Sequence, residues 1–401
     1  MTKRFIFTSE SVTAGHPDKL CDQISDAVVD HVLSQDPHSD LVCQSAIANG
    51  VLFLAASLDS SARVDMPEVA REVMRHIGYP EDVFNADACT ILTTLNECEH
   101  NPVWDLELSE LDDKELDQVV ATNQVMAFGY ACNQNEAMIP TPIWLAHRMV
   151  ARMDSQQVRE AMPYLLPDGK AQVSVDFRND RPKRVHGVMF KASQVKKGGP
   201  DAVEFSEQIK QHVIQPVLSE TLPADEKTQI LVNPGGPFYG GGPAAHPGQT
   251  GRKAGADTYG NYARNGGTAL SGKGPTHIER AGAYLARFLA KNVVTAGLAK
   301  ECEVQISYAF GQPGPDSLRV RTNGTNKVDN AVIHDRLMKF CDMRLGAIVR
   351  DFNLRNLPRQ DSTTDFYRRL AVYGHMGRTD MDVPWEDTSR AKELKKDFAK
   401  K

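Results

Sequence analysis

Apolar residues recur along this chain with two different periods, and their alternation predicts a mixture of helices and strands. In the stretch 17–28, Leu20, Ile24, Ala27 and Val28 share one face of a helix with 3.6 residues per turn. Similar patterns predict further helices over residues 64–79, 204–218 and 278–297. Strands are predicted in pairs within 41–59, around the turn Asn49-Gly50, and at 171–177, 185–194, 228–234 and 301–311. These elements alternate without the regular rhythm of a doubly wound sheet.

Two segments lack strong periodicity. Residues 96–118 are acidic, and we expect a mobile loop with a short helix. Such a loop is either a lid over a site or a plain surface loop. The polar tail from Pro384 onward is expected to fray.

Size, charge and cysteine content narrow the class of protein. The 401 residues are long enough for two or three domains, and the net charge of −6 argues against a general nucleic-acid binder. No apolar run reaches the roughly 18 residues of a membrane span, and the N-terminus lacks the pattern of a signal peptide. The seven cysteines are scattered, without a CxxC spacing, which favours reduced thiols in a cytoplasm.

Glycine is concentrated in residues 233–280, which hold thirteen of the 29 glycines together with several Lys and Arg residues. Glycine lets backbone N–H groups approach an anion closely, while Lys and Arg supply charge. The run from Gly266 to Lys273 resembles a phosphate cradle before the helix near Ile278, but its spacing is not that of a Walker A motif. The composition alone leaves phosphate binding and a turn-rich loop open.

The stretch GHPDK, residues 15–19, combines an imidazole, a carboxylate and an ammonium at the start of a predicted helix. A bound polyphosphate needs magnesium, and magnesium needs hard oxygen ligands. Asp18 and Glu279 each lie at a predicted helix start beside a basic residue. Each is either a magnesium ligand or a solvated cap.

Ordered motifs along nearly the whole chain resemble the S-adenosylmethionine synthase (methionine adenosyltransferase) family. They are FTSESVTAGHPDKLCDQISDAV, FGYACN, PDGKAQV, LVNPGGPF, TGRKAGADTYG, GGTALSGKGP, AKNVVTAGLA and YGHMGR. The resemblance implies an α+β fold of three similar, partly discontinuous domains. It also implies attack of the methionine sulfur on C5′ of ATP, with release and hydrolysis of tripolyphosphate, in one-carbon metabolism. The site must then hold sulfur and C5′ in line and stabilise charge on the leaving group.

The resemblance also assigns roles to individual residues. His16 would assist cleavage of the C5′–oxygen bond, and Phe238 would stack on adenine. The implied catalytic residues are His16, Lys170, Arg252 and Lys273. The implied ATP-binding residues are Lys170, Phe238, Arg252, Lys253, Lys273, Phe310 and Asn123. The implied magnesium ligands are Asp18 and Glu279, the latter at a position where the family has aspartate.

Departures from the family pattern gather around the implied acceptor pocket. Ser57 and His246 replace a glutamate and an aspartate, and His277 replaces a lysine. Asn123 replaces an aspartate near the ribose. Gln44 replaces a potassium-binding glutamate, which puts potassium dependence in doubt. Each lost charge-assisted contact typically costs about 1.5–3 kcal/mol.

The phosphate-side residues of the family are retained, while those of the implied acceptor pocket are changed, and three functional hypotheses follow. The first is a methionine adenosyltransferase that uses Mg²⁺ and whose rewritten loop supplies replacement contacts. The second is a related ATP-dependent enzyme with another nucleophile, either another sulfur compound or water. The third is a non-catalytic nucleotide-binding subunit of an active relative. Retention of the phosphate-side residues argues against the third.

The family resemblance further predicts the domain limits and the assembly. The N-terminal domain would comprise residues 1–14 and 134–241, the central domain 15–104 and 242–280, and the C-terminal domain 112–133 and 281–401. A lid loop would cover 96–118. We expect a homodimer or dimer of dimers with shared active sites, with ATP and methionine or an analogue as substrates.

Overall fold

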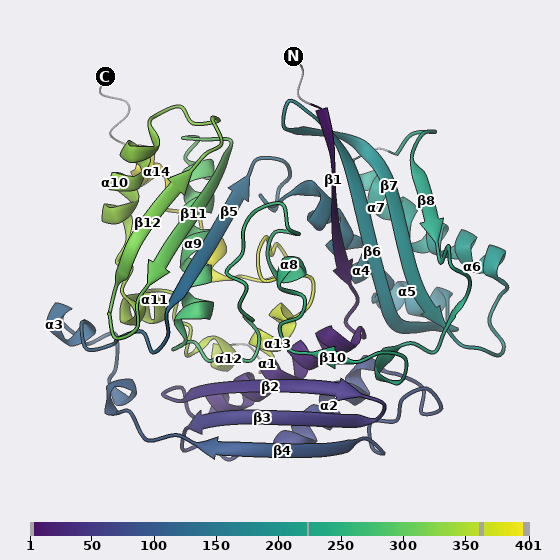
Figure 1. Cartoon of the computed structure of the whole chain (residues 1–401), viewed down its shortest axis with the longest axis horizontal. Helices are drawn as coiled ribbons and strands as arrows, with labels where there is room; N and C mark the ends of the chain where they lie inside the picture. Colours follow the sequence, from purple (N-terminus) through teal and green to yellow (C-terminus); the bar gives the residue numbers. More distant parts are fainter. Residues whose placement is uncertain (1–3, 223, 361–364, 396–401) are drawn as a thin grey trace.

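Three β-sheets surround a central group of helices in the computed structural model, which describes residues 4–222, 224–360 and 365–395 (Figure 1). Sheet A has the strand order β1-β6-β7-β8, with β9 also paired to β7. Sheet B has the order β10-β2-β3-β4, and sheet C has the order β12-β11-β5. The predicted α+β class is therefore confirmed.

Each sheet combines strands that are far apart in the sequence. Sheet A contains β1 (Arg4–Val12), β6 (Leu165–Arg178), β7 (Arg181–Gln194), β8 (Gln229–Val232) and β9 (Phe238–Tyr239). Sheet B contains β2 (Asp40–Ala48), β3 (Val51–Asp59), β4 (Thr90–Glu97) and β10 (Gly248–Gln249). Sheet C contains β5 (Val125–Cys132), β11 (Glu301–Tyr308) and β12 (Pro315–Arg321). The strands of each sheet fall within one of the three predicted pairs of chain segments, while the residue limits of the domains stay a prediction.

The three sheets repeat one plan. In each, two consecutive antiparallel strands form a hairpin, and a strand from a distant segment pairs antiparallel with the first of them. In sheets A and B, a helical connection then leads to a further strand that is parallel to the second hairpin strand. The repetition supports three similar units.

Two-residue turns of positive φ close two of the hairpins. Asn49 and Gly50 have φ values of 47° and 77°, and Ala48 pairs with Val51 across the turn. This backbone twist matches the twist of the strands, so the predicted turn is confirmed. Asn179 and Asp180 make the equivalent turn, with φ values of 51° and 59°. Strands β6 and β7 run up to this turn and are longer than the predicted strands 171–177 and 185–194.

Long helices cover one face of each sheet. Helix α1 (Pro17–Gln35) packs on β2, α4 (Thr141–Met153) packs on β1 and β6, and α9 (Ile278–Thr295) packs on β5 and β11. The predicted helix 64–79 is α2 (Met66–Ile77), which ends at Gly78 with φ of 82°. The predicted helix 204–218 is the run of α6 (Ala202–Ile209), a π-helical turn (Lys210–Ile214) and α7 (Gln215–Glu220).

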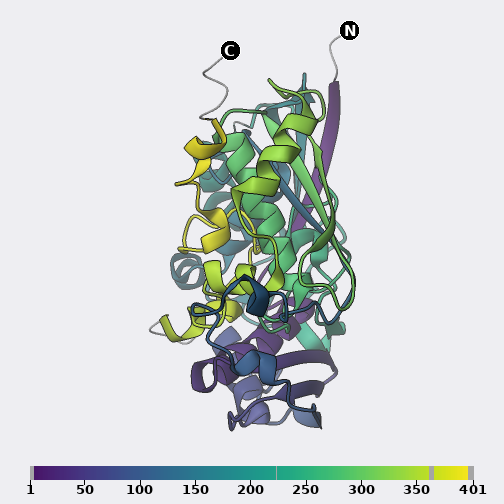
Figure 2. The same cartoon turned by 90° about the vertical axis from the view of Figure 1, so that its left-hand side faces the viewer.

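The remaining helices are short. In chain order, α3 (Asp113–Leu116) lies between β4 and β5, and α5 (Gln156–Ala161) lies between α4 and β6. The glycine-rich segment contains α8 (Ala254–Asp257). The C-terminal part contains α10 (Asn330–Phe340), α11 (Leu345–Asp351), α12 (Leu357–Gln360), α13 (Phe366–Leu370) and α14 (Ala391–Lys395). Figure 2 shows the C-terminal helices, in yellow, on the side of the molecule opposite to β1.

Two expectations need correction. The predicted loop 96–118 contains a 3₁₀ turn (Pro102–Asp105) and α3, but its first two residues belong to β4. The segment from Pro384 to Lys395 does not fray, because Trp385 is fully buried and stacks on Tyr284 with ring centroids 3.6 Å apart. A buried aromatic ring anchors this part of the tail although its neighbours in sequence are polar. Residues 396–401 lie outside the described residues.

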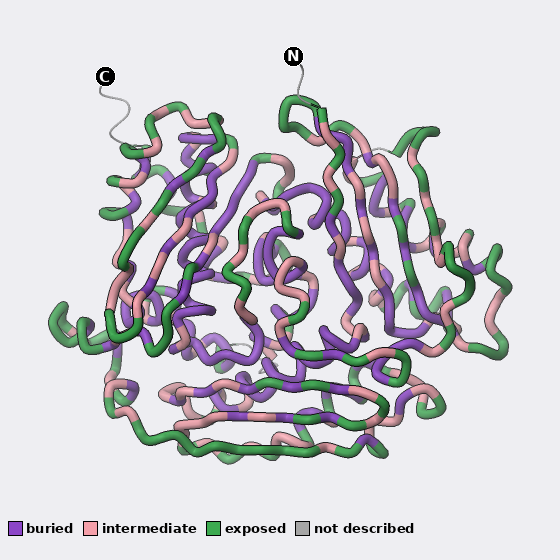
Figure 3. Tube along the Cα trace, in the orientation of Figure 1, coloured by how far each residue is buried: buried purple, intermediate pink, exposed green. Residues whose placement is uncertain are grey.

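One face of sheet B is open in this chain, and Figure 3 shows β4 as largely exposed. Val51, Phe53 and Leu92 lie on this face and are 43%, 48% and 53% exposed. Gln44 also lies here, because it pairs with Ala55, which is two residues after Phe53 on the same face of β3. None of the helices in the described ranges is both long and apolar enough to cross a bilayer.

Candidate functional site

The start of α1 holds the imidazole of the GHPDK stretch. His16 is the N-cap residue, and its Nδ1 accepts a hydrogen bond of 3.2 Å from the backbone N–H of Asp18. Pro17 follows at the first helical position, where the missing N–H costs nothing. A neutral ring that accepts at Nδ1 carries its proton at Nε2. The local sequence therefore fixes both the position and the tautomer of His16.

Asp18 forms ion pairs with two cationic side chains of the glycine-rich segment. Its Oδ2 lies 2.7 Å from Lys253 Nζ, and its Oδ1 lies 3.7 Å from Arg252 Nη1. Oδ1 also accepts the backbone N–H of Gln249 at 3.0 Å. Burial disfavours the charged form of Asp18, but its hydrogen bond and ion pair with Lys253 outweigh this and hold the pKa of the carboxyl below its usual value. Four of the predicted site residues are thus brought together at the start of α1.

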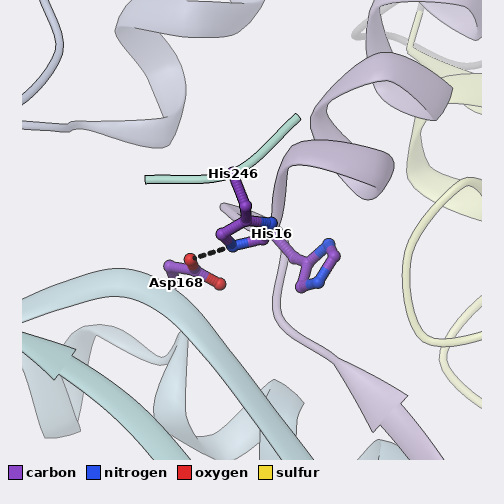
Figure 4. Close-up of side chains that lie close together, drawn as sticks. All are labelled: His16, Asp168 and His246. Carbon is purple, nitrogen blue, oxygen red and sulfur yellow. Dashed lines mark hydrogen bonds and ion pairs between the residues drawn. The ribbon is translucent and has the colours of Figure 1, made fainter. Parts of the chain in front are cut away.

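His246 lies on the other side of His16 and contacts a carboxylate. Its Nε2 is 2.8 Å from Asp168 Oδ2, and the rings of His16 and His246 have centroids 4.9 Å apart (Figure 4). Asp168 is only 2% exposed, and its Oδ2 also accepts the backbone N–H of Gly242 at 2.8 Å. Burial lowers the pKa of His16 to about 4, against the opposing charge of Asp168, so His16 is neutral at pH 7.

The glycine-rich segment is held by acidic side chains of α1 rather than left open as a cradle. Gly251 N–H donates to Asp22 Oδ1 at 2.7 Å, and Gly272 N–H donates to Asp26 Oδ1 at 2.8 Å. Asp26 also forms a buried ion pair with Arg280, at 2.8 Å. These two amides are not available to phosphate. The regular spacing of Asp18, Asp22 and Asp26 is a signal that sequence analysis missed, because it looks like a solvated helix face.

A second group of predicted residues lies at the start of α9. Glu279 Oε1 accepts a hydrogen bond of 2.8 Å from Asn123 Nδ2, while Glu279 Oε2 is buried and has no hydrogen-bond partner. Lys273 Nζ donates to the carbonyl of Ala269 at 2.6 Å, and burial lowers its pKa although the charge of Glu279 opposes this shift. Within the described part of the chain, no hydrogen bond or ion pair joins this group to the one around His16.

In the part of the chain that the structure describes, no hydrogen bond or ion pair links Lys170, Phe238 or Phe310 to the His16 group or to the Glu279 group. Lys170 Nζ is 2.5 Å from Glu10 Oε2, across strands β6 and β1. Lys191 Nζ lies 3.8 Å from the ring centroid of Phe238, a cation–π contact. Phe310 is 72% exposed. Their proposed roles toward ATP stay predictions.

The residues assigned to the acceptor pocket are separated in this chain. His246 belongs to the His16 group, whereas His277 Nε2 lies 3.0 Å from Asp40 Oδ1 at the start of β2. Ser57 is half-buried on β3, and Gln44 is exposed on β2. The structure therefore places only His246 beside the start of α1.

Sequence analysis missed several side chains that contact predicted site residues, among them Asp168 and Lys191. Asp168 lies two residues before Lys170 in the motif PDGKAQV, so a carboxylate next to a predicted phosphate ligand was an available signal. Lys191 lies in β7 and carries no local signal, because only the pairing of β7 with β9 brings it to Phe238.

Comparisons with known proteins cover nearly the whole chain. Three family models match in order: the N-terminal domain of S-adenosylmethionine synthetase over residues 4–99, the central domain over 118–238 and the C-terminal domain over 240–387. A protein of Parasynechococcus marenigrum named S-adenosylmethionine synthase is 43% identical, over 99% of this chain and 98% of its own. Proteins of the same name from Trichodesmium erythraeum and Microcystis aeruginosa are 40% and 41% identical, over at least 98% of both chains.

Proposed function

Because the chain belongs to the S-adenosylmethionine synthetase family, we propose that it forms S-adenosylmethionine from ATP and L-methionine and releases tripolyphosphate, which it then hydrolyses. The observation that carries this proposal is the group at the start of α1, where His16, Asp18, Arg252 and Lys253 converge. The full-length relatives share the name of this transferase activity. A different nucleophile and a non-catalytic subunit are therefore not favoured.

The reaction is a substitution at carbon, and the chain's own residues serve its leaving group. The methionine sulfur attacks C5′ of ATP, the C5′–O5′ bond breaks, and the electron pair of that bond leaves with the triphosphate. His16 is neutral and carries its proton on Nε2, so it can donate a hydrogen bond to the departing oxygen. Arg252 and Lys253 place positive charge where negative charge develops, which lowers the barrier.

A divalent cation fits the second group better than the first. The buried, unpartnered Oε2 of Glu279 is a hard oxygen donor of the kind that Mg²⁺ prefers. Asp18 shares its carboxylate with Lys253, so a cation there has to compete with the ammonium. When bound, Mg²⁺ would neutralise part of the triphosphate charge. We propose Mg²⁺ as the ion, with Glu279 and Asp18 as the side chains that would hold it.

A carboxylate lies beside the substituted position 246. His246 occupies the position where the family resemblance implies an aspartate. The buried carboxylate of Asp168 nevertheless lies 2.8 Å from His246 Nε2. A methionine ammonium near His246 would still meet the field of a carboxylate. This arrangement supports methionine as the acceptor in spite of the lost acidic residues.

We further propose a homodimer with shared active sites. The two groups of site residues are not joined within one chain, and the open face of sheet B carries Val51, Phe53 and Leu92. A second copy on this face would cover apolar surface that water otherwise contacts. It could also bring the His16 group of one chain near the Glu279 group of the other.

The described cysteines are unpaired, which is consistent with the reducing cytoplasm.

The proposal is tested by incubating the purified protein with ATP, Mg²⁺ and methionine and separating the products by chromatography. A sulfonium product with phosphate and pyrophosphate is the expected result. ATP loss with free adenosine, or with another adenosylated compound, would point to a different nucleophile. No turnover with any candidate acceptor would contradict an enzymatic role.

A further inference from the structure

Two histidines and a buried aspartate lie together beside the proposed phosphate site. His16, Asp168 and His246 each offer one ligand atom, and these three atoms all lie within 4.8 Å of one another (Figure 4). We infer that these three side chains form a binding site for a divalent transition-metal ion of the zinc class. This set of ligands shares no residue with the proposed Mg²⁺ ligands Glu279 and Asp18, although Asp18 Oδ2 lies 3.8 Å from His16 Nδ1.

The set of donor atoms selects the kind of metal. Two imidazole nitrogens and one carboxylate oxygen suit Zn²⁺, Co²⁺ or Ni²⁺, whereas Mg²⁺ prefers oxygen ligands alone. The ligand atoms of a tetrahedral zinc ion lie about 3.3–3.6 Å from one another, given bonds of about 2.0–2.2 Å. The three ligand atoms, which lie within 4.8 Å of one another, would have to move closer to reach that spacing. Three protein ligands would leave a fourth position for water.

The aspartate is already held for such a role. Asp168 is 2% exposed, and the backbone N–H of Gly242 fixes its Oδ2 at 2.8 Å. Such a supporting hydrogen bond orients a metal ligand before the metal arrives. His246 now donates from Nε2 to the same oxygen. For Nε2 to bind a metal, its proton would move to Nδ1, which leaves the ring neutral. His16 would give up the hydrogen bond that its Nδ1 accepts from the Asp18 N–H, because either Nδ1 itself binds the metal or the proton of Nε2 moves there.

The substitution at position 246 provides the second imidazole among the three proposed metal ligands. The family resemblance places an aspartate there, which with Asp168 would give two carboxylates and one imidazole. His246 replaces one of them by nitrogen, and this shifts the preference of the site from hard to borderline metals. A metal held here would also engage His16, so we expect it to inhibit the proposed reaction. That inhibition rests on the proposed function, whereas metal binding itself does not.

Metal binding is tested on the full-length protein, free of ATP and Mg²⁺, by titration with Co²⁺ and by calorimetry with Zn²⁺. We expect one ion per chain and the visible absorption of four-coordinate Co²⁺. His246→Gln and Asp168→Asn should each weaken binding by about 100-fold or more, since even the loss of a supporting residue costs about 10–100-fold. Circular dichroism establishes that each variant is folded.

His334→Gln is the matched control. His334 lies 3.0 Å from Asp335, yet no third ligand joins this pair among the residues that the structure describes. Metal binding should be unchanged in this variant. The inference is overturned if the wild type binds no Co²⁺, or if His246→Gln and Asp168→Asn bind Zn²⁺ as tightly as the wild type. Because no substrate is present, these results do not depend on whether the protein makes S-adenosylmethionine.

Discussion

The group around His16 and the group around Glu279 are built in opposite ways. At the start of α1, the residues satisfy one another: Asp18 pairs with Lys253, and His246 pairs with Asp168. At the start of α9, Glu279 keeps one buried oxygen without a hydrogen-bond partner in the described part of the chain, and Lys273 donates to the carbonyl of Ala269. A buried unpaired polar atom costs free energy unless a ligand satisfies it. The comparison shows that the polar side chains of the first group find partners within one chain. The second group has a buried oxygen that a cation or a partner could satisfy.

The largest expected effect comes from His16→Ala. Loss of the hydrogen bond to the leaving oxygen should lower kcat by about 10²–10⁴-fold. ATP affinity should change far less, because we propose that other residues, Arg252 and Lys253 among them, hold the phosphates. Single-turnover kinetics and nucleotide titration separate the two quantities. Equal losses in kcat and in ATP binding would remove the proposed role of His16.

Glu279→Gln tests the second group. The variant keeps the shape and the contact with Asn123 but loses the charge of the unpartnered oxygen. We expect the Mg²⁺ concentration for half-maximal activity to rise by about 10–100-fold, the equivalent of one charge-assisted contact. Glu303→Gln is a suitable control, since Glu303 pairs with Arg264 instead. An unchanged Mg²⁺ requirement in Glu279→Gln would place the cation elsewhere.

Mixing these two variants, at an Mg²⁺ concentration too low for Glu279→Gln to turn over, tests whether the groups meet across subunits. A dimer of one His16→Ala chain and one Glu279→Gln chain would contain one site with both native residues. Random reassociation should therefore restore about a quarter of the wild-type turnover, because half of the dimers would be mixed and each would hold one good site. Turnover that stays at the level of the separate variants would show that each site lies within one chain.

A substitution at Gln44 should change activity less than the substitutions at His16 and Glu279. It lies exposed on β2 and has no carboxylate for potassium. Gln44→Glu should increase the activation by potassium by about fivefold at most, since exposed charges contribute about 1 kcal/mol or less. Activity with and without added KCl measures the change. Strong potassium activation of the wild-type protein would contradict this expectation.

The smallest effect is expected in the pH profile. An ordinary histidine gains its proton as the pH falls through about 6.5. The lowered pKa of His16, about 4, keeps it neutral above that value, so activity lost through its protonation should appear only as the pH falls toward 4. The profile of kcat/KM should thus show no step near pH 6.5 that His16→Gln removes. Such a step would mean that His16 is less buried in the working enzyme.

Much of the fold follows from local sequence. The periodicity of residues 17–28 and 278–297 predicts α1 and α9, and Asn49-Gly50 predicts the hairpin of β2 and β3. The family motifs predict three similar units. The tail was predicted wrongly, because the burial of Trp385 against Tyr284 depends on a ring more than 100 positions away. Local polarity carries no information about such a contact.

The sequence by itself determined the chemical types at the site: an imidazole, carboxylates and cations in recognisable motifs. Only the tertiary structure decided which of them meet. Asp168 reaches His246 because the segment after β9 returns to β6, and Asp22 and Asp26 bind glycine amides more than 200 residues away in sequence. The physical reason is that contacts between distant segments depend on packing and strand pairing, whereas the sequence pattern reports only the preferences of neighbouring residues.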